Sequence, residues 1–309
     1  MRISKNKPEL IIICGPTGIG KTALTMEIYK HYPSIIISAD SIQTYRFMNI
    51  GSAKPSEKEL KKTPHELIDI CNPDENFDAG KFTDRASAII EKAYAANKIS
   101  IITGGTGLYI KSLTKGLFRS RPADKDILEA LCKEEKTKGP GHLYSRLKKT
   151  DPQTAVKIHP NDTFRLARAL ECFISTGEKI SSMRANQQNI EKFNYLKLGL
   201  IMDRKNLYER IEKRVDIMIE EGLLEEVEKL RSMGYGRELK AMNSIGYKHM
   251  NIYIDGEVSW EEAIRLLKRD TRRYAKRQLT WFNADPEIHW IHPEDTKKAR
   301  ELIDNFLAG

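Results

Sequence analysis

Cysteine is scarce in this chain, and its spacing excludes two classes of protein. Four of the 309 residues are cysteine, at positions 14, 71, 132 and 172, and no two of them form a Cys-x-x-Cys pair. The seven histidines show no zinc-binding spacing either. A disulfide-rich secreted domain and a zinc-ribbon protein are therefore excluded, and we expect reduced thiols, a cytoplasmic location and no structural metal.

Long hydrophobic runs are also missing. Apolar runs such as Ile11–Cys14 are far shorter than the roughly 18 residues of a membrane-spanning helix. The basic N-terminus is followed by an apolar run too short for a signal peptide, so we expect neither a membrane protein nor a secreted precursor. Hydrophobic residues still make up 40% of the chain, which is enough for a folded core.

The charge is mildly basic. Fifty-two Lys and Arg residues against 43 Asp and Glu residues give a net charge of +9, which points to an acidic or phosphorylated partner. The excess is uneven, because residues 119–196 carry 15 basic and 10 acidic residues, whereas residues 197–309 carry 21 of each. Charge alone leaves many soluble enzymes possible.

The order of predicted elements indicates an α/β fold. Strand-like runs over 9–14, 34–38 and 98–103 alternate with helical patterns over 21–32 and 84–97. These strands are β-branched and do not alternate with polar residues, which is typical of a buried parallel sheet. We therefore expect a P-loop NTPase-like parallel sheet flanked by helices.

Residues 119–196 break this alternation and show helical patterns only. Helices are expected over 124–136, 142–149 and 164–176, the last with an N-cap in 161–163 and a stop at Gly177. The polar stretch 181–189 bounds this segment, and a strand-like run over 196–202 follows it. We expect an all-helical insertion domain over 119–196 in a catalytic core formed by 1–118 and 197–309. Helices ending at Gly222 and Gly234, and a long helix over 260–282, complete the core.

A glycine-rich loop is the most specific motif in the chain. It follows the first strand, opens the first helix and fits G-x-x-x-x-G-K-[ST] through Gly15, Pro16, Thr17, Gly18, Ile19, Gly20, Lys21 and Thr22. Its backbone N–H groups and Lys21 are suited to phosphate oxygens, and the Thr22 hydroxyl to Mg²⁺. By itself the loop predicts a polyphosphate ester, usually a nucleoside triphosphate.

Polar residues follow the next two strands and should face this loop, because chemistry gathers at the carboxyl ends of parallel strands. Asp40 is expected to be a general base or a water-mediated Mg²⁺ ligand, or alternatively a helix cap. Thr106 follows Gly104 and Gly105, which would permit close approach of a ligand. Thr106 is either a ligand-binding hydroxyl or a simple helix N-cap.

Two groups of cations extend the pattern. Arg210 and Arg214 share one helix face and could bind one anion, or could instead pair with acids such as Glu209 and Asp216. Residues 264–282 hold seven basic residues and one acid, with Tyr274, Trp281 and Phe282 interleaved. Such a helix suits a nucleic acid, although a solvated, charged helix face would look the same.

Taken together, these motifs and several others resemble the tRNA dimethylallyltransferase (tRNA isopentenyltransferase) family, bacterial type, over nearly the whole chain. The joint order of the motifs carries the resemblance, and the segments are GPTGIGKT at 15–22, SADSIQ at 38–43 with Tyr45, NIGSAKP at 49–55, PHELID at 64–69, GGTGLY at 104–109, IHPND at 158–162, RLARAL at 165–170, SIGYK at 244–248 and KRQLTW at 276–281.

The resemblance implies transfer of a dimethylallyl group from dimethylallyl diphosphate to N6 of the adenosine immediately 3′ of the tRNA anticodon, with diphosphate and Mg²⁺ at the loop. It implies that Asp40 is the general base, that Thr106 binds the diphosphate near the breaking bond, and that Arg214 binds the phosphates. The tRNA contacts that it implies are Asp40, Ser41, Ile42, Gln43, Phe164, Arg165, Leu166, Ala167, Arg168, Asn243, Ser244, Ile245, Gly246, Tyr247, Lys248, Lys276, Arg277, Gln278, Leu279, Thr280, Trp281, Phe282 and Asn283. We also expect a monomer that binds tRNA and no membrane.

The chain departs from the family pattern at a few places. Phe164 stands where a glutamine is expected, so that contact would be stacking instead of hydrogen bonding. Leu128 stands where some members have arginine, and it is not assigned to the site. Ser52 replaces the usual threonine and keeps the hydroxyl. The chain has no C-terminal Cys/His set of the kind that eukaryotic relatives often carry, which fits a bacterial form.

Three other functions remain open at this point. One is an isopentenyltransferase acting on free adenine nucleotides, which would have little need of a basic helical insertion. Another is a P-loop kinase or ATPase, which would leave SADSIQ and GGTGLY unexplained. The third is an RNA-binding protein without catalysis, which would leave the loop and Asp40 unused.

Overall fold

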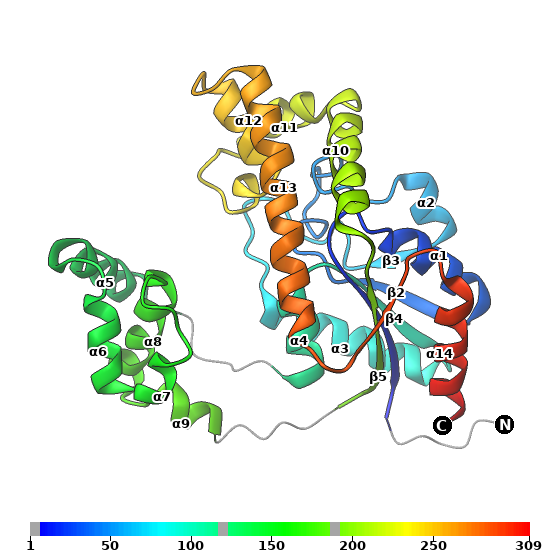
Figure 1. The fold of residues 1–309 in the computed structure, drawn as a ribbon, viewed down its shortest axis with the longest axis horizontal. Coiled ribbons are helices and arrows are strands. Elements are labelled where there is room, and N and C mark those ends of the chain that lie inside the picture. The colour runs from blue at the N-terminus through cyan, green and yellow to red at the C-terminus, as the bar shows by residue number, and fades with distance from the viewer. Residues whose placement is uncertain (1–6, 117–122, 186–191) are drawn as a thin grey trace. The chain divides into compact units, whose positions relative to one another are not determined.

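The computed structural model describes residues 7–116, 123–185 and 192–309, which form two compact units (Figure 1). One unit comprises residues 1–115 and 191–309, and the other comprises 116–190. Arg2, Lys5 and part of the polar stretch 181–189 lie outside the described residues. No helix in the described ranges combines the length and apolar character needed to cross a membrane.

The larger unit is built on one parallel six-stranded sheet of order β3-β2-β4-β1-β5-β6. Its strands are β1 (Glu9–Cys14), β2 (Ser34–Ser38), β3 (His65–Glu66), β4 (Ile99–Gly104), β5 (Asn194–Leu200) and β6 (Ile288–Ile291). The sheet confirms the predicted α/β fold. Two strands, β3 and β6, were not predicted, because two to four residues are too few for a clear pattern.

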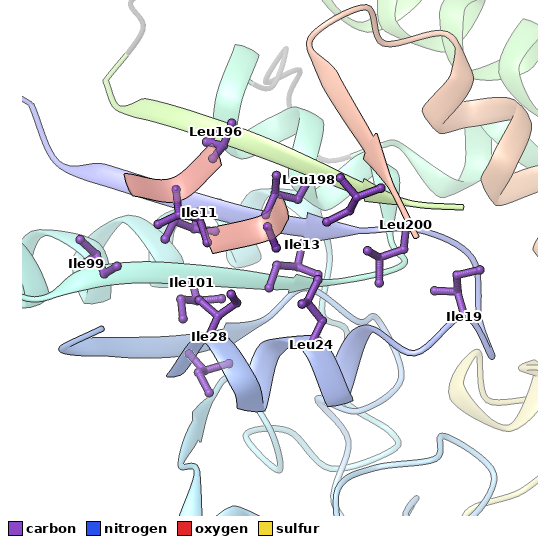
Figure 2. Close-up of a cluster of buried hydrophobic side chains, with 14 of the residues drawn as sticks. Ile11, Ile13, Ile19, Leu24, Ile28, Ile99, Ile101, Leu196, Leu198 and Leu200 are labelled. Atoms are coloured by element: carbon purple, nitrogen blue, oxygen red, sulfur yellow. The ribbon is translucent and has the colours of Figure 1, made fainter. Parts of the chain in front are cut away.

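Helices pack against this sheet or extend beyond it (Figure 1). They are α1 (Lys21–His31), α2 (Glu57–Lys62), α3 (Ala79–Ala95), α4 (Gly107–Lys115), α10 (Arg204–Glu220), α11 (Leu223–Ser232), α12 (Tyr247–Ile254), α13 (Trp260–Asn283) and α14 (Thr296–Ala308), with a 3-10 turn at Ala241–Asn243. Apolar side chains of β1, β4, β5 and α1 meet in one buried cluster, which Figure 2 shows around Ile11, Ile13 and Leu198. Burial on both faces explains why β1 reads as an unbroken apolar run.

The strand order decides where the polar loops lie. Strand β4 lies between β2 and β1, with Ser38 opposite Thr103 and Cys14 opposite Gly104. The segments that follow these three strands therefore emerge side by side at one edge of the sheet. The amide of Ala39 donates to the carbonyl of Thr103 at 2.7 Å, and the amide of Thr106 donates to the carbonyl of Ala39 at 3.2 Å.

The smaller unit is all helical in its described part. Its helices are α5 (Lys125–Lys138), α6 (His142–Thr150), α7 (Pro152–Ala155), α8 (Thr163–Thr176) and α9 (Ile180–Ala185). Leu131, Leu143 and Leu166 contribute to its own buried core. The predicted cap and stop of α8 are both present, because Asp162 accepts a hydrogen bond from the amide of Arg165 at 3.1 Å and Gly177 adopts a left-handed conformation.

Candidate active site

Two cavities meet beside the glycine-rich loop. We call the first the phosphate-loop cavity; its volume is about 640 Å³, and residues of the loop, α10 and α13 line it. We call the second the helix-lined cavity; its volume is about 400 Å³, and α10, α13 and residues 243–248 enclose most of it. Thr17, Asp40, Ser52, Arg214 and Tyr274 line both cavities, so the two are continuous.

The glycine-rich loop has the backbone that its motif predicts. Gly18 and Gly20 have φ angles of 78° and 109°, which non-glycine residues rarely adopt. The Lys21 ammonium donates to the carbonyls of Gly15 and Pro16 at 3.0 and 2.8 Å. Burial of that ammonium lowers the pKa of Lys21 to about 8, although nearby Asp40 acts in the opposite direction.

Asp40 lies where the cavities join, as predicted for a residue after the second strand. Its Oδ1 accepts hydrogen bonds from the amides of Ile42 and Gln43 at 2.9 and 3.3 Å, so the side chain stabilises a turn. No helix of the described chain begins here, so the alternative of a helix cap is wrong. No side chain or amide of the described residues donates to Oδ2. One carboxylate oxygen therefore fixes the turn, and the other is open to the cavities.

The charge of Asp40 changes the pKa values of two neighbouring groups, Arg214 and Tyr274. Burial lowers the pKa of the Arg214 guanidinium, and the Asp40 charge partly restores it. Burial, followed by repulsion from Asp40, raises the pKa of the Tyr274 phenol and keeps it neutral at physiological pH. Sequence reasoning noted Tyr274 only as one of three aromatics on the helix. No local pattern places it beside Asp40, because folding alone brings these two remote residues together.

Thr106 joins the loop after β2 to the loop after β4, so it does more than cap a helix. Its hydroxyl oxygen accepts a hydrogen bond from the Ser41 amide at 3.1 Å, and its carbonyl accepts from the Tyr109 amide at 2.9 Å. Its contact with a diphosphate stays a prediction.

Gly104 and Gly105 were expected to let a ligand come close, but in the structure other protein groups come close to them. A Cβ on Gly104 would lie 2.2 Å from the Ala39 carbonyl oxygen, and a Cβ on Gly105 would lie 2.3 Å from Gln278 Nε2. Protein groups, more than a ligand, therefore require glycine here. Gly105 still lines the phosphate-loop cavity.

The arginines of α10 point to the phosphate loop. Arg210 and Arg214 both line the phosphate-loop cavity, together with Lys213, which sequence reasoning missed. Asp216, considered as a partner for these arginines, pairs with Lys268 instead, at 2.6 Å. The two arginines thus share one cavity, and their binding of one anion stays a prediction.

Most cations of the basic helix α13 are already paired with acids of the protein. Five of its seven cations pair with acids of the described residues: Arg265 with Glu262, Lys268 with Asp216, Arg272 with Glu212, and Arg269 and Arg273 with Asp270. Lys276 and Arg277 have no such acidic partner in the described ranges. Most cations of α13 therefore belong to a charged helix face that is paired with acids of the protein. The two cations without such a partner among the described residues, Lys276 and Arg277, lie toward its C-terminal end.

The predicted tRNA contacts fall into three groups by exposure. The exposed members are Phe164, Arg165, Asn243, Lys276, Arg277, Thr280, Trp281 and Asn283. The partly exposed members are Asp40, Ser41, Ile42, Gln43, Arg168, Ser244, Ile245, Lys248 and Leu279. The buried members are Leu166, Ala167, Gly246, Tyr247, Gln278 and Phe282. Contacts by all three groups stay predictions, but the buried side chains pack within the protein.

Gln43 and Gln278 are already engaged inside the protein. The side-chain amide of Gln43 donates to the carbonyls of Ser52 and Ala53 at 3.4 and 3.2 Å, and its oxygen accepts from the Ser38 hydroxyl at 3.1 Å. Gln278 connects the two glycine-containing loops through Thr17 and Gly105, at 2.9 Å each.

Comparison with known proteins agrees with this architecture. Residues 43–285 match the IPP transferase family model. The tRNA dimethylallyltransferase of Desulfosudis oleivorans is 46% identical over 303 residues, which cover 97% of this chain and 96% of that protein. The tRNA isopentenylpyrophosphate transferase of Bacillus halodurans is 38% identical, with a TM-score of 0.74 over 98% of this chain and 97% of that one.

A more distant structure has the same fold. A eukaryotic dimethylallyltransferase acting on tRNA is 27% identical, with a TM-score of 0.83 over 97% of this chain and 80% of that one. The family model spans the helical insertion, the loop after β4 and most of the helices, and the full-length relatives also cover the phosphate loop and the rest of the sheet. The chain therefore belongs to the IPP transferase family of tRNA dimethylallyltransferases and is an enzyme of the transferase class.

Proposed function

We propose that the protein transfers a dimethylallyl group from dimethylallyl diphosphate to N6 of the adenosine immediately 3′ of the anticodon in tRNA, releasing diphosphate. The observation that carries this proposal is the position of Asp40 at the junction of two cavities of different character. One cavity is rich in cations and loop amides, and the other has an apolar wall and polar ends. A donor and an acceptor would each occupy one of them.

The phosphate-loop cavity would hold the donor's diphosphate. Loop N–H groups, Lys21, Arg210, Lys213 and Arg214 supply positive potential where charge develops as the C–O bond breaks. Thr106 would donate its hydroxyl proton to a diphosphate oxygen, while its hydroxyl oxygen accepts from the Ser41 amide.

Thr22 fits a Mg²⁺ ion that is held mainly by the diphosphate. Its side chain is exposed in the first turn of α1 and lines the phosphate-loop cavity. The described residues contain no group of three or more acidic, His or Cys side chains that could hold a metal. This donor set suits Mg²⁺, which keeps several waters and binds through few protein groups plus substrate phosphates. Bound there, the ion would neutralise charge on the leaving diphosphate.

The helix-lined cavity would receive the target adenine. Its apolar wall includes Ile211, Val215 and Leu267, and polar groups of residues 243–248 lie around its rim. An adenosine in a stacked loop must swing out to reach such a cavity.

Asp40 Oδ2 would accept one N6 proton. The nitrogen lone pair forms the new N–C bond, and the electrons of the allylic C–O bond leave with diphosphate.

The outer surface would bind the rest of the anticodon stem-loop. In the larger unit, the exposed cations Lys276 and Arg277 and the exposed aromatic Trp281 suit phosphates and unstacked bases. Residues 119–196 are proposed to contribute tRNA contacts through Phe164, Arg165 and Arg168. We further propose that the enzyme is monomeric and that it is cytoplasmic; the four free cysteines support the second point.

The test is incubation of labelled dimethylallyl diphosphate and Mg²⁺ with unmodified tRNA that carries adenosine 3′ of the anticodon. The matched control is the same tRNA with guanosine at that position. We expect label in the first RNA only. Label on free adenine nucleotides but not on tRNA would support the nucleotide-prenylating alternative, and rapid ATP hydrolysis without label transfer would support a kinase or ATPase.

A further inference from the structure

A single carboxylate holds the loop that forms one wall of the helix-lined cavity. Glu226 on α11 accepts hydrogen bonds at Oε2 from the amides of Asn49 and Ile50, at 2.9 and 2.8 Å. Its Oε1 accepts from the Gly51 amide at 3.1 Å and from the Tyr247 hydroxyl at 2.7 Å. Four donors therefore converge on one side chain, and three of them are consecutive backbone N–H groups.

This carboxylate joins two segments that are far apart in the sequence. Gly51 and Ser52 line the helix-lined cavity on one side, and residues 243–246, immediately before Tyr247, line it on another. The packing is close, because a Cβ on Gly51 would lie 2.5 Å from the Tyr247 ring. Glu226 thus sets the distance between two walls of the cavity.

The loop continues from these hydrogen bonds to the site. The carbonyls of Ser52 and Ala53 accept hydrogen bonds from the side-chain NH₂ of Gln43. The backbone N–H of Gln43 in turn donates to Asp40 Oδ1. Ala53 has a φ angle of 47°, an unfavourable conformation that persists only where neighbouring contacts enforce it. At the far end of the loop, the buried Lys54 ammonium donates to Asn49 Oδ1 at 2.8 Å and Asp69 Oδ1 at 2.6 Å.

We propose that Glu226 is a positioning residue for the prenyl transfer: by gathering the amides of residues 49–51 and the Tyr247 hydroxyl, it fixes the cavity wall and, through Gln43, the turn that carries Asp40. Glu226 contacts neither cavity itself. The proposal rests on the proposed function, in which the helix-lined cavity receives the target adenine.

The test compares Glu226→Gln with Glu228→Gln. Both changes remove one negative charge from α11, but Glu228 is exposed. The glutamine at 226 presents an NH₂ group to N–H donors, so the carboxylate is not replaced. We expect Glu226→Gln to lower kcat/KM for tRNA by about tenfold or more, the effect of losing hydrogen bonds to a charged group. The inhibition constant of inorganic diphosphate should stay within about twofold, because Glu226 bonds to none of the groups proposed to bind diphosphate: the loop amides, Lys21, Arg210, Lys213 and Arg214.

Amide hydrogen exchange provides a readout that does not depend on activity. The amides of residues 49–51 should be protected in the wild type and in Glu228→Gln, and should exchange faster in Glu226→Gln. Tyr247→Phe, which removes one of four donors, should have a smaller effect on both readouts. The value of kcat/KM is corrected for the folded fraction, so a purely global destabilisation would leave both the corrected kcat/KM and the inhibition constant of diphosphate unchanged and would overturn the proposal.

Two other results would also overturn it: unchanged kcat/KM in Glu226→Gln, or unchanged exchange at residues 49–51. A wild-type protein that transfers no prenyl group to tRNA would instead overturn the proposed function. Slow exchange at residues 49–51 that is lost in Glu226→Gln would then still establish Glu226 as the anchor of the loop.

Discussion

The side-chain oxygen of Gln278 accepts a hydrogen bond at 2.9 Å from the backbone N–H of Thr17, which lies 261 residues earlier in the chain. The other half of the same amide donates to the Gly105 carbonyl at 2.9 Å. A buried side chain of α13 therefore holds the loop after β1 and the loop after β4 in register. The long basic helix is therefore part of the active-site scaffold, and the proposed function adds tRNA binding at its exposed C-terminal end.

Replacing Gln278 should loosen the phosphate loop. We expect Gln278→Ala to lower the free energy of unfolding by about 1–3 kcal/mol, because one buried and one partly buried backbone group lose their partner. We also expect it to weaken diphosphate binding. Gln278→Glu keeps the acceptor for Thr17 and loses the donor for Gly105, so it should retain more of the diphosphate affinity. Chemical denaturation and calorimetric titration with diphosphate would measure both effects. Equal diphosphate affinity in wild type and Gln278→Ala would contradict this prediction.

Asp40→Asn should separate catalysis from loop geometry. The asparagine oxygen would still accept from the amides of Ile42 and Gln43, as Asp40 Oδ1 does, but it cannot take a proton. We expect turnover to fall by about 10²-fold or more, the range for a lost general base, with tRNA affinity largely kept. Asp40→Ala should lower turnover similarly and also destabilise the turn. Single-turnover kinetics and tRNA binding would show this, and normal turnover in Asp40→Asn would exclude the base role.

Diphosphate affinity should fall as the pH rises above about 8, where the free protein loses the Lys21 proton. The decline should approach tenfold per pH unit if only charged Lys21 binds the anion. Lys21→Gln has no such proton, so its pH profile should show only the titration of diphosphate itself. Calorimetry between pH 7 and about 9.5 would test the difference, and parallel profiles would contradict it.

The titration of Lys21 should raise the free energy of unfolding with pH, whereas it lowers diphosphate affinity. Its pKa in the folded protein lies below the ordinary value of 10.5, so the unfolded chain binds the proton more tightly. The contribution of Lys21 to the free energy of unfolding is therefore full above pH 10.5 and is lost as the pH falls through about 8. Denaturation of wild type and Lys21→Gln across this range should show a steeper rise with pH in the wild type.

The ion pairs of α13 predict which of its cations bind tRNA. Arg277→Ala should weaken tRNA binding and reduce the slope of log affinity against log salt by about one, because Arg277 has no acidic partner among the described residues. Its guanidinium lies 5.7 Å from the Tyr274 ring centroid, at the border of the helix-lined cavity. Arg272→Ala should change the slope less, because Arg272 pairs with Glu212. Filter binding at several salt concentrations would rank them, and the reverse ranking would contradict the assignment.

The sequence by itself determined the parallel α/β core, the glycine-rich phosphate loop and the helical insertion. These features depend on local patterns: unbroken β-branched strands, a motif with fixed spacing, and caps such as Asp162 and Gly177. Asp40 was also predicted, because its position after a strand fixes the edge of the sheet at which it lies. The family resemblance supplied the reaction that these local patterns left open.

Only the tertiary structure decided how the loops are held and which charges are available. Tyr274, Gln278 and Glu226 interact with residues that lie between 21 and 261 positions away in the sequence. No local pattern specifies such partners. The seven cations of α13 look equivalent in the sequence, but five are paired once the chain is folded. The physical reason is that hydrogen bonds and ion pairs depend on distances of a few ångströms, which folding sets between residues remote in the chain.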